Sequence, residues 1–353
     1  MMDKYDDIFT IEKQANTENY LRNLWKGKEK TAFSAYSSQP VYRQLENSAE
    51  MAEKAAENIL SGLSLPGFNI PRFIADYGTV STAAYWGGKR HTPVGGCIGI
   101  DTVIKNAEQV SDISPEHPLN GDVKRALTDF NAVSDKLGTT RLRSSFIDIQ
   151  GPLNTAALLW QQDDFMASMY EEPEAVHQLL EIVTEQLISI IKATIESFGS
   201  EKLSGPLWPF IWLPADIGIA FTEDYMPLLS PKLYKEFGIP YIEKINREFG
   251  GIFLHCCGEY EHQLENLKNA DINLLGLEFT YPYMNPKVMF NTFGSSAIYV
   301  PFLGLHGKTE FPKHNEYLRY LKSERLDETK LWFLLDSSDE DFNEQVKIVE
   351  GMI

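Results

Sequence analysis

The chain has 353 residues, of which 43% are hydrophobic and 23% are charged, the composition of a globular enzyme rather than of a disordered segment. Acidic residues outnumber basic ones by 50 to 32, which gives a net charge of −18. Proteins that bind nucleic acids or anionic membranes usually carry a basic stripe, and none is visible in this sequence. No apolar run approaches the roughly 18 residues that a membrane span requires.

The first sixteen residues, MMDKYDDIFTIEKQAN, mix acids with bases and contain no hydrophobic core of the kind found in secretory signals. The three cysteines, Cys97, Cys256 and Cys257, are odd in number and two of them are adjacent, which does not resemble a disulfide framework. We therefore expect a cytoplasmic protein with reduced thiols.

The pattern along residues 1–64 predicts helices, one with Leu21, Leu24 and Trp25 on a single face and a second over Ala49–Leu63. The next apolar stretch, NIPRFIADYGTV, predicts a first strand followed by a loop that carries Asp76. Glycines then mark a looped region around Cys97, and a further helix is expected over 122–137.

A regular alternation of strands and helices begins near Ser145. The segment FIDIQ (146–150) predicts a strand, and a long amphipathic helix is expected from Pro173, which suits the first helical position, to about Phe198. Another strand is expected within 207–213, and another helix within 231–249.

Short apolar runs at 252–257, 273–278, 297–303 and 331–335 predict four strands, each followed by a helical segment. Four βα units in succession favour a (β/α)8 TIM barrel over an open doubly wound sheet, since no glycine-rich nucleotide-binding fingerprint is present. We expect an N-terminal helical segment, 1–64, packed on a TIM-barrel catalytic domain, 65–353.

The segment GGIFLHCCGEYEH is the most informative in the chain for chemistry. Side chains alternate along a strand, so His255 and Cys257 point to one side while Leu254 and Cys256 point to the other. The strand ends at Gly258, and the carboxyl ends of barrel strands form the active-site rim. One imidazole and one thiolate at this spacing supply half of a tetrahedral zinc site. A buried cysteine beside a hydrogen-bonded histidine is the alternative.

A zinc site also requires a third ligand from another strand. Candidates at the ends of later strands are Glu278, His306 and Asp336, and all three are zinc ligands by type. For each of them, an exposed rim residue or a helix cap is the alternative, and the composition of the Ser-Ser-Asp-Glu-Asp loop at Asp336 agrees with capping.

Two longer stretches resemble the uroporphyrinogen decarboxylase superfamily. They are IDIQGPLNTAALLWQQDDFMASMYEEPEAVHQLLEIVTE and LPADIGIAFTEDYMPLLSPKLYKEFGIPYIEKI, and the H-x-C-G at 255–258 falls where the superfamily carries a similar strand end. The resemblance covers roughly residues 65–350 and implies a TIM barrel with its cleft at the carboxyl rim.

In the decarboxylase branch, an arginine-rich motif binds the substrate carboxylates and an aspartate in a following loop is essential. The corresponding region of this chain offers only Arg43, and an octa-anionic substrate would need the missing arginines near a protein of net charge −18. Asp76 lies roughly where the catalytic aspartate falls, in a different local context.

The other branch contains zinc-dependent methylcobamide:thiol methyltransferases, including those of the coenzyme M type. They hold zinc by H-x-C and a cysteine after the last strand. His255 and Cys257 match the first part. Near the third position this chain has Asp336 and no cysteine, a departure that implies an oxygen ligand, a changed thiol preference or no metal. The resemblance is closer to this branch and implies zinc and a corrinoid as cofactors, with aromatic residues near the rim, Trp208, Trp212 and Tyr281, lining a pocket for the flat cofactor. Core packing is the commoner role of such residues.

The sequence therefore predicts a zinc-dependent methyltransferase that moves a methyl group between a corrinoid and a thiol or similar acceptor. The partners expected are a small-molecule acceptor, a corrinoid protein and a second copy of the chain, without nucleic acid or membrane. The alternatives are a decarboxylase of tetrapyrrole metabolism that uses Asp76, and a non-catalytic corrinoid-binding barrel.

Overall fold

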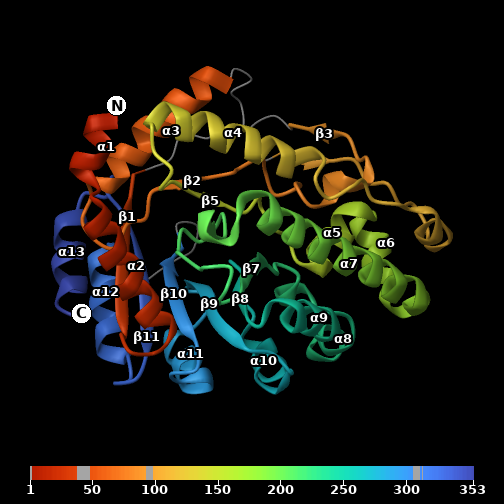
Figure 1. Ribbon diagram of the computed structural model, residues 1–353. Helices are drawn as coiled ribbons and strands as arrows, with labels where there is room; N and C mark the ends of the chain where they lie inside the picture. The colour runs from red at the N-terminus through yellow and green to blue at the C-terminus, as the bar shows by residue number, and fades with distance from the viewer. Residues whose placement is uncertain (1, 38–47, 93–97, 305–310, 312) are drawn as a thin grey trace.

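The computed structural model describes residues 2–37, 48–92, 98–304, 311 and 313–353. Parallel strands run through its middle and helices surround them, which confirms the predicted TIM barrel (Figure 1). The strands of the two parallel sheets are β1 (Thr31–Tyr36), β2 (Arg72–Phe73), β5 (Arg143–Ser145), β6 (Leu203–Gly205), β7 (Ile219–Thr222), β8 (Ile252–His255), β9 (Leu274–Tyr281), β10 (Ile298–Leu303) and β11 (Lys330–Asp336).

The strands pair in the order β1-β11-β10-β9-β8-β7, and a second sheet has the order β2-β5-β6, where β6 is Leu203–Gly205. A parallel bridge between Gln150 and Thr222 joins the two sheets. Between β1 and β2, the bridge among the described residues is antiparallel. It joins Ser34 of β1 to Gly67, which precedes β2. This seam is the irregular part of the barrel wall.

The helices cover the outside of the sheet (Figure 1). They are α1 (Met2–Ile8), α2 (Ile11–Trp25), α3 (Ser48–Leu63), α4 (Gly121–Leu137), α5 (Pro152–Leu159), α6 (Gln162–Glu171), α7 (Pro173–Phe198), α8 (Pro231–Phe237), α9 (Ile239–Phe249), α10 (Leu264–Asn269), α11 (Pro286–Phe293), α12 (His314–Glu324) and α13 (Phe342–Glu350). A small hairpin, β3 (Arg90–His91) with β4 (Gly99–Ile100), lies apart from the barrel strands.

Alternation along the strands separates two cores. Outward-facing residues such as Leu254 and Phe333 pack with the helices, whereas Phe253 and Trp332 pack inside the barrel. Leu21 and other buried residues of α2 belong to the inner core. This helix therefore closes the end of the barrel at which the strands begin.

Most of the predicted elements are present. The helix expected over 173–198 is confirmed as α7, that over 122–137 as α4, and the four strands of the last hundred residues as β8 to β11. The helical region expected over 231–249 is divided between α8 and α9 at Gly238.

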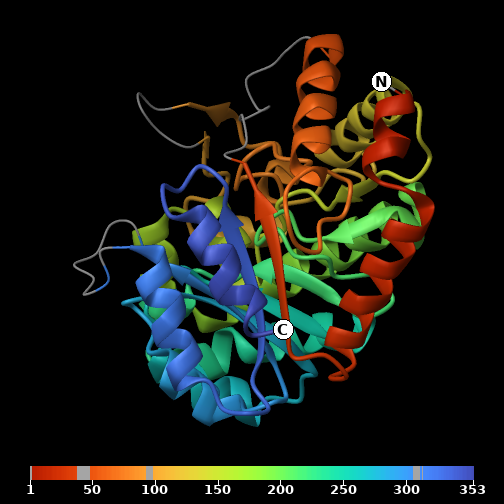
Figure 2. The ribbon, with the colours of Figure 1, turned by 90° about the vertical axis from the view of Figure 1, so that its left-hand side faces the viewer.

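The prediction that residues 1–64 are only helical is wrong at 31–36. This segment is strand β1, which pairs in parallel with β11 over its whole length, as the neighbouring first and last strands in Figure 2 show. The barrel therefore begins inside the predicted extension. A partner strand about three hundred residues away determines this conformation, so local pattern could not reveal it.

The strand expected within 207–213 is also wrong. The regular strands lie on either side of it, as β6 and β7, and Pro209 interrupts the segment because it has no backbone N–H for a ladder. Ile211, Trp212 and Leu213 are instead buried in the inner core. Among the described residues, no helix is long and apolar enough to cross a membrane.

Helix α2 allows a test of the inner core. Leu21 is 0% exposed and Ile11, on the same helix, is 74% exposed. We expect Leu21→Ala to lower the free energy of unfolding by about 2–5 kcal/mol, since it leaves a cavity in the barrel. Ile11→Ala should change it by less than about 0.5 kcal/mol. Urea unfolding of both variants makes the comparison, and equal losses would contradict the assignment of α2 as the closure of the barrel.

Candidate functional site

Strand β8 carries the H-x-C pair to the rim of the barrel. Leu254 and Cys256 belong to the outer core, and Phe253 belongs to the inner core. Because side chains alternate, His255 and Cys257 continue the inward row of Phe253. The predicted orientation of the pair is confirmed.

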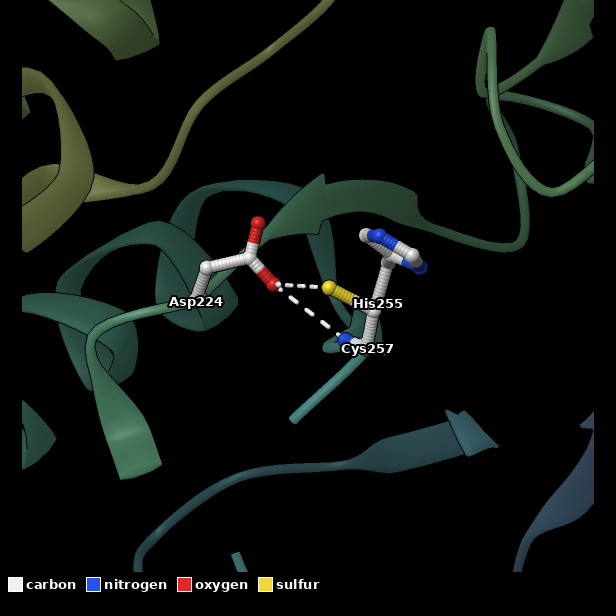
Figure 3. A group of neighbouring side chains, drawn as sticks. All are labelled: Asp224, His255 and Cys257. Carbon is white, nitrogen blue, oxygen red and sulfur yellow. Dashed lines mark hydrogen bonds between the residues drawn. The ribbon is translucent and has the colours of Figure 1, made fainter. Parts of the chain in front are cut away.

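A carboxylate completes the group. One ligand atom each from Asp224, His255 and Cys257 lies within 4.8 Å of the others (Figure 3). Asp224 Oδ1 accepts a hydrogen bond from the backbone N–H of Cys257 at 3.2 Å and lies 3.6 Å from its Sγ. The three side chains therefore face one small volume at the carboxyl ends of β7 and β8.

The pairing of β7 with β8 explains why Asp224 is there. Thr222 is the register partner of His255, and the N–H of Glu223 donates to the His255 carbonyl at 2.8 Å. Extending this parallel register by two residues places Asp224 opposite Cys257. The carboxylate and the thiol meet because both follow paired strand ends.

The three side chains fit a zinc ion by type, and the thiol and the carboxylate also fit it by spacing. Zinc binds imidazole nitrogen, thiolate sulfur and carboxylate oxygen. Bond lengths of about 2.3 Å to sulfur and about 2.1 Å to oxygen, at a tetrahedral angle, place the two ligand atoms about 3.6 Å apart. The Cys257 Sγ and Asp224 Oδ1 are 3.6 Å apart before any ion is bound.

Glu278 of β9 supports His255 from inside the barrel. Its side chain is 1% exposed, and its carboxylate contacts His255 Nδ1. Burial lowers the pKa of His255, against a smaller opposite effect of Asp224, which favours the neutral imidazole. A neutral ring with Nδ1 at a carboxylate presents Nε2 to a metal, the usual arrangement of a ligating histidine.

The environment of Cys257 raises the pKa of its thiol to about 11. Burial is the main cause, and the charge and hydrogen bond of Asp224 add to it. The thiol is thus protonated at neutral pH in the isolated chain, and a divalent cation would displace that proton.

The other predicted ligands lie differently. Glu278 touches His255 but is not one of the three grouped ligands. Asp336 is outside the group, and its Oδ1 accepts hydrogen bonds from the N–H and hydroxyl of Ser338 at 2.9 and 2.7 Å, as expected for a turn cap. His306 and Arg43 lie outside the described residues.

Asp76 follows β2, as predicted, and its Oδ1 accepts from the N–H of Gly78 at 3.0 Å. It is not in the group of Asp224, His255 and Cys257. Its predicted catalytic role stays a prediction.

The three aromatic residues predicted to bind a cofactor occupy different surroundings. Trp208 packs on Phe302, with ring centroids 5.1 Å apart. Trp212 is buried in the inner core, so it takes the packing role. Tyr281 lies 5.3 Å from the Phe311 ring and also packs against Tyr317 and Tyr320. Cofactor binding by these residues remains a prediction.

Sequence reasoning missed Asp224. The signal was the short apolar run IAFT followed by two acids, which is the pattern of a strand end with polar side chains at a rim. The sequence pattern predicts a strand within 207–213 rather than at β7, so it does not mark Glu223 and Asp224 as residues that follow a strand end.

Comparison with known proteins finds a family resemblance over part of the chain. Residues 42–200 match the model of the uroporphyrinogen decarboxylase family. The predicted resemblance to the uroporphyrinogen decarboxylase superfamily is confirmed. The matched residues run from before β2 to the end of α7 and include Asp76, whereas Asp224, His255 and Cys257 lie beyond them.

One solved structure shares the fold over nearly the whole chain. A methyltransferase from Methanosarcina mazei superposes with a TM-score of 0.70 at 16% identity, over 95% of this chain and 98% of that chain. A protein described as a vitamin-B12 independent methionine synthase from Listeria monocytogenes gives a TM-score of 0.39 at 12% identity, over 72% of this chain and 73% of that one. No curated protein matches the sequence significantly.

Beside the site, Glu223 is fully buried, and its carboxylate oxygens accept no hydrogen bond from the described residues. A Cβ at position 151 would lie 2.3 Å from Glu223 Oε2 and 2.9 Å from the Thr222 carbonyl oxygen, so this close approach of backbone favours glycine. Burial, with a smaller effect of Asp224, raises the pKa of Glu223 well above its ordinary value of 4.5. Burial thus favours the neutral form of this carboxyl.

This burial predicts a pH effect on stability. An acid with a raised pKa in the folded state loses stabilisation as the pH rises above 4.5, its pKa in the unfolded chain. Glu223→Gln removes the ionisation. The free energy of unfolding of this variant minus that of the wild type should therefore increase from pH 5 to pH 8. Urea unfolding across this range measures the difference. Glu259→Gln, at an exposed position, is the control, and a pH-independent difference for Glu223→Gln would refute the prediction.

Proposed function

We propose that the protein is a zinc-dependent methyltransferase whose metal is held by Asp224, His255 and Cys257. The observation that carries this proposal is the convergence of one carboxylate, one imidazole and one thiol at the barrel rim, where TIM-barrel enzymes perform their chemistry. Asp224 takes the place that the sequence pattern had suggested for Asp336.

When bound, zinc with three protein ligands and an open position supplies a Lewis acid that lowers the pKa of an acceptor thiol. The remaining roles belong to the chain. Glu278 orients His255 through Nδ1, and the hydrogen bond from the Cys257 N–H holds the Asp224 carboxylate against the thiol. Barrel strands fix all of these groups, so little reorganisation is needed.

The methyl donor in this proposal is a corrinoid. The support is the resemblance to the methylcobamide branch of the superfamily, together with a barrel shared almost end to end with a methyltransferase. When bound, a methylcobamide would supply the methyl group, and Asp224, His255 and Cys257 would hold the zinc beside which the acceptor thiol binds.

Decarboxylation remains the second candidate because the family match covers Asp76. The sequence lacks the paired arginines that would bind a polycarboxylate, and the Asp76 carboxylate makes a local turn contact with Gly78. Turnover of uroporphyrinogen by purified protein, lost in Asp76→Asn, would place this activity first and leave zinc without a role.

The metal site makes a direct prediction. Purified protein should bind close to one equivalent of zinc, measured by elemental analysis after dialysis. Asp224→Asn and Cys257→Ser should each lose most of it, because each removes one of three ligands. Glu259→Gln alters an exposed carboxylate two residues beyond Cys257 and should retain zinc.

Asp336→Asn separates the two assignments of the third ligand. Retained zinc in this variant agrees with Asp224 as the ligand. Loss of zinc in Asp336→Asn, with full zinc in Asp224→Asn, would overturn the assignment made from the structure. Wild-type protein free of zinc after exposure to the metal would remove the proposal itself.

Substitution of Glu278 should weaken zinc binding without abolishing it. Glu278→Gln keeps the shape of the side chain but removes the charge at His255 Nδ1, and we expect zinc affinity to fall by about 10- to 100-fold. Competition with a chelator measures the affinity. Demethylation of methylcobalamin by candidate thiols, followed by its visible spectrum, should decline in the same order as zinc occupancy. Activity that does not follow zinc would contradict a role of the metal in catalysis.

A further inference from the structure

A cavity lies at the seam between β1 and β2, where the barrel wall is irregular. Its volume is about 80 Å³, enough for several water molecules. The described residues that line it come from both sides of the wall, with α3 outside and the barrel strands inside. They are Ser34, Ala35, Tyr36, Asn58, Ile59, Gly62, Leu63, Phe68, Asn69, Ile70, Arg72, Ile74, Phe210, Trp212, Trp332 and Leu334.

Arg72 is the only charged residue in this lining. It lies on β2 among aromatic and aliphatic side chains, and no acidic side chain accompanies it in the described lining, although the whole chain carries a net charge of −18. One cation among aromatic and aliphatic side chains, with the polar side chains of Ser34, Asn58 and Asn69 also in the described lining, is the pattern of a pocket for a small organic anion.

The guanidinium of Arg72 is incompletely satisfied by the described residues. Nη1 donates to the Ile211 carbonyl at 2.8 Å, and the group stands 5.5 Å from the centroid of the Phe210 ring. No carboxylate among the described residues forms an ion pair with it. A desolvated cation without a counter-charge is costly, so a bound anion would stabilise this arrangement.

Desolvation lowers the pKa of Arg72 to about 9. The guanidinium consequently remains charged at neutral pH. Its planar fork can donate two parallel hydrogen bonds to a carboxylate, which a lysine at the same place could not do.

We propose that the cavity at the β1–β2 seam binds a small organic carboxylate, with its charged end at Arg72 and its apolar part against Phe210 and Trp332. This site is distinct from the group of Asp224, His255 and Cys257 and does not depend on zinc. Its volume suits a short acid rather than a tetrapyrrole.

Titration with butyrate, followed by isothermal calorimetry or by protein NMR shifts, tests the proposal. Butyramide is the matched neutral probe. Butyrate should saturate the wild-type protein, butyramide should bind much more weakly, and Arg72→Met should weaken butyrate by about tenfold or more, because it removes a charge-assisted bidentate contact.

Gly62→Leu tests the cavity without changing Arg72. Gly62 lines the cavity from α3, and a Cβ built there meets no atom within 4 Å, so a leucine can enter the space without backbone strain. We expect Gly62→Leu to abolish butyrate binding while the protein stays as stable as the wild type, since replacing a helical glycine is favourable. Zinc content should be unchanged in both variants, which separates this site from the metal site.

Equal affinity for butyrate and butyramide, or unchanged butyrate binding in Arg72→Met, would overturn the proposal. If Arg72→Met does not fold, Gly62→Leu decides the question, and butyrate binding that survives in it refutes the cavity as the site.

Discussion

The parallel pairing of β7 with β8 is the constraint on which the candidate site depends. It places Thr222 beside His255, and the next two residues of each strand end carry Asp224 and Cys257 to the same point. The ladder is a backbone interaction, so the convergence of the three side chains follows from hydrogen bonds that do not involve them. Rigid strand ends then hold the ligands at a spacing that already suits a tetrahedral metal.

The interior of the barrel supports this rim from below. Helix α2 closes the end at which the strands begin, and the Trp25 indole N–H donates to the Trp212 carbonyl at 2.8 Å, which ties the helix to the irregular segment after β6. Large side chains such as Phe253 and Trp332 fill the space between. At the opposite end, β8 and β9 present the polar side chains of His255 and Glu278.

Ionisable groups buried near the barrel interior fall into different electrostatic situations. Glu278 has a histidine at contact distance, whereas Glu223 and Arg72 find no opposite charge among the described residues. For Glu223 the outcome is a neutral carboxyl, since protonation removes the cost of burial. Arginine loses its proton much less readily, so Arg72 stays charged. For this reason Arg72, and not Glu223, indicates an external ligand of opposite charge.

The sequence by itself determined the barrel, the long helix at 173–198, the last four strands and the shared face of His255 and Cys257, because these follow from local periodicity and alternation. Only the tertiary structure decided that 31–36 is a strand, that Asp224 rather than Asp336 stands beside Cys257, and that Arg72 faces a cavity. Each of these depends on contacts between segments that are distant in the chain. The stabilisation comes from the partner segment, so the pattern of the local sequence alone does not reveal it.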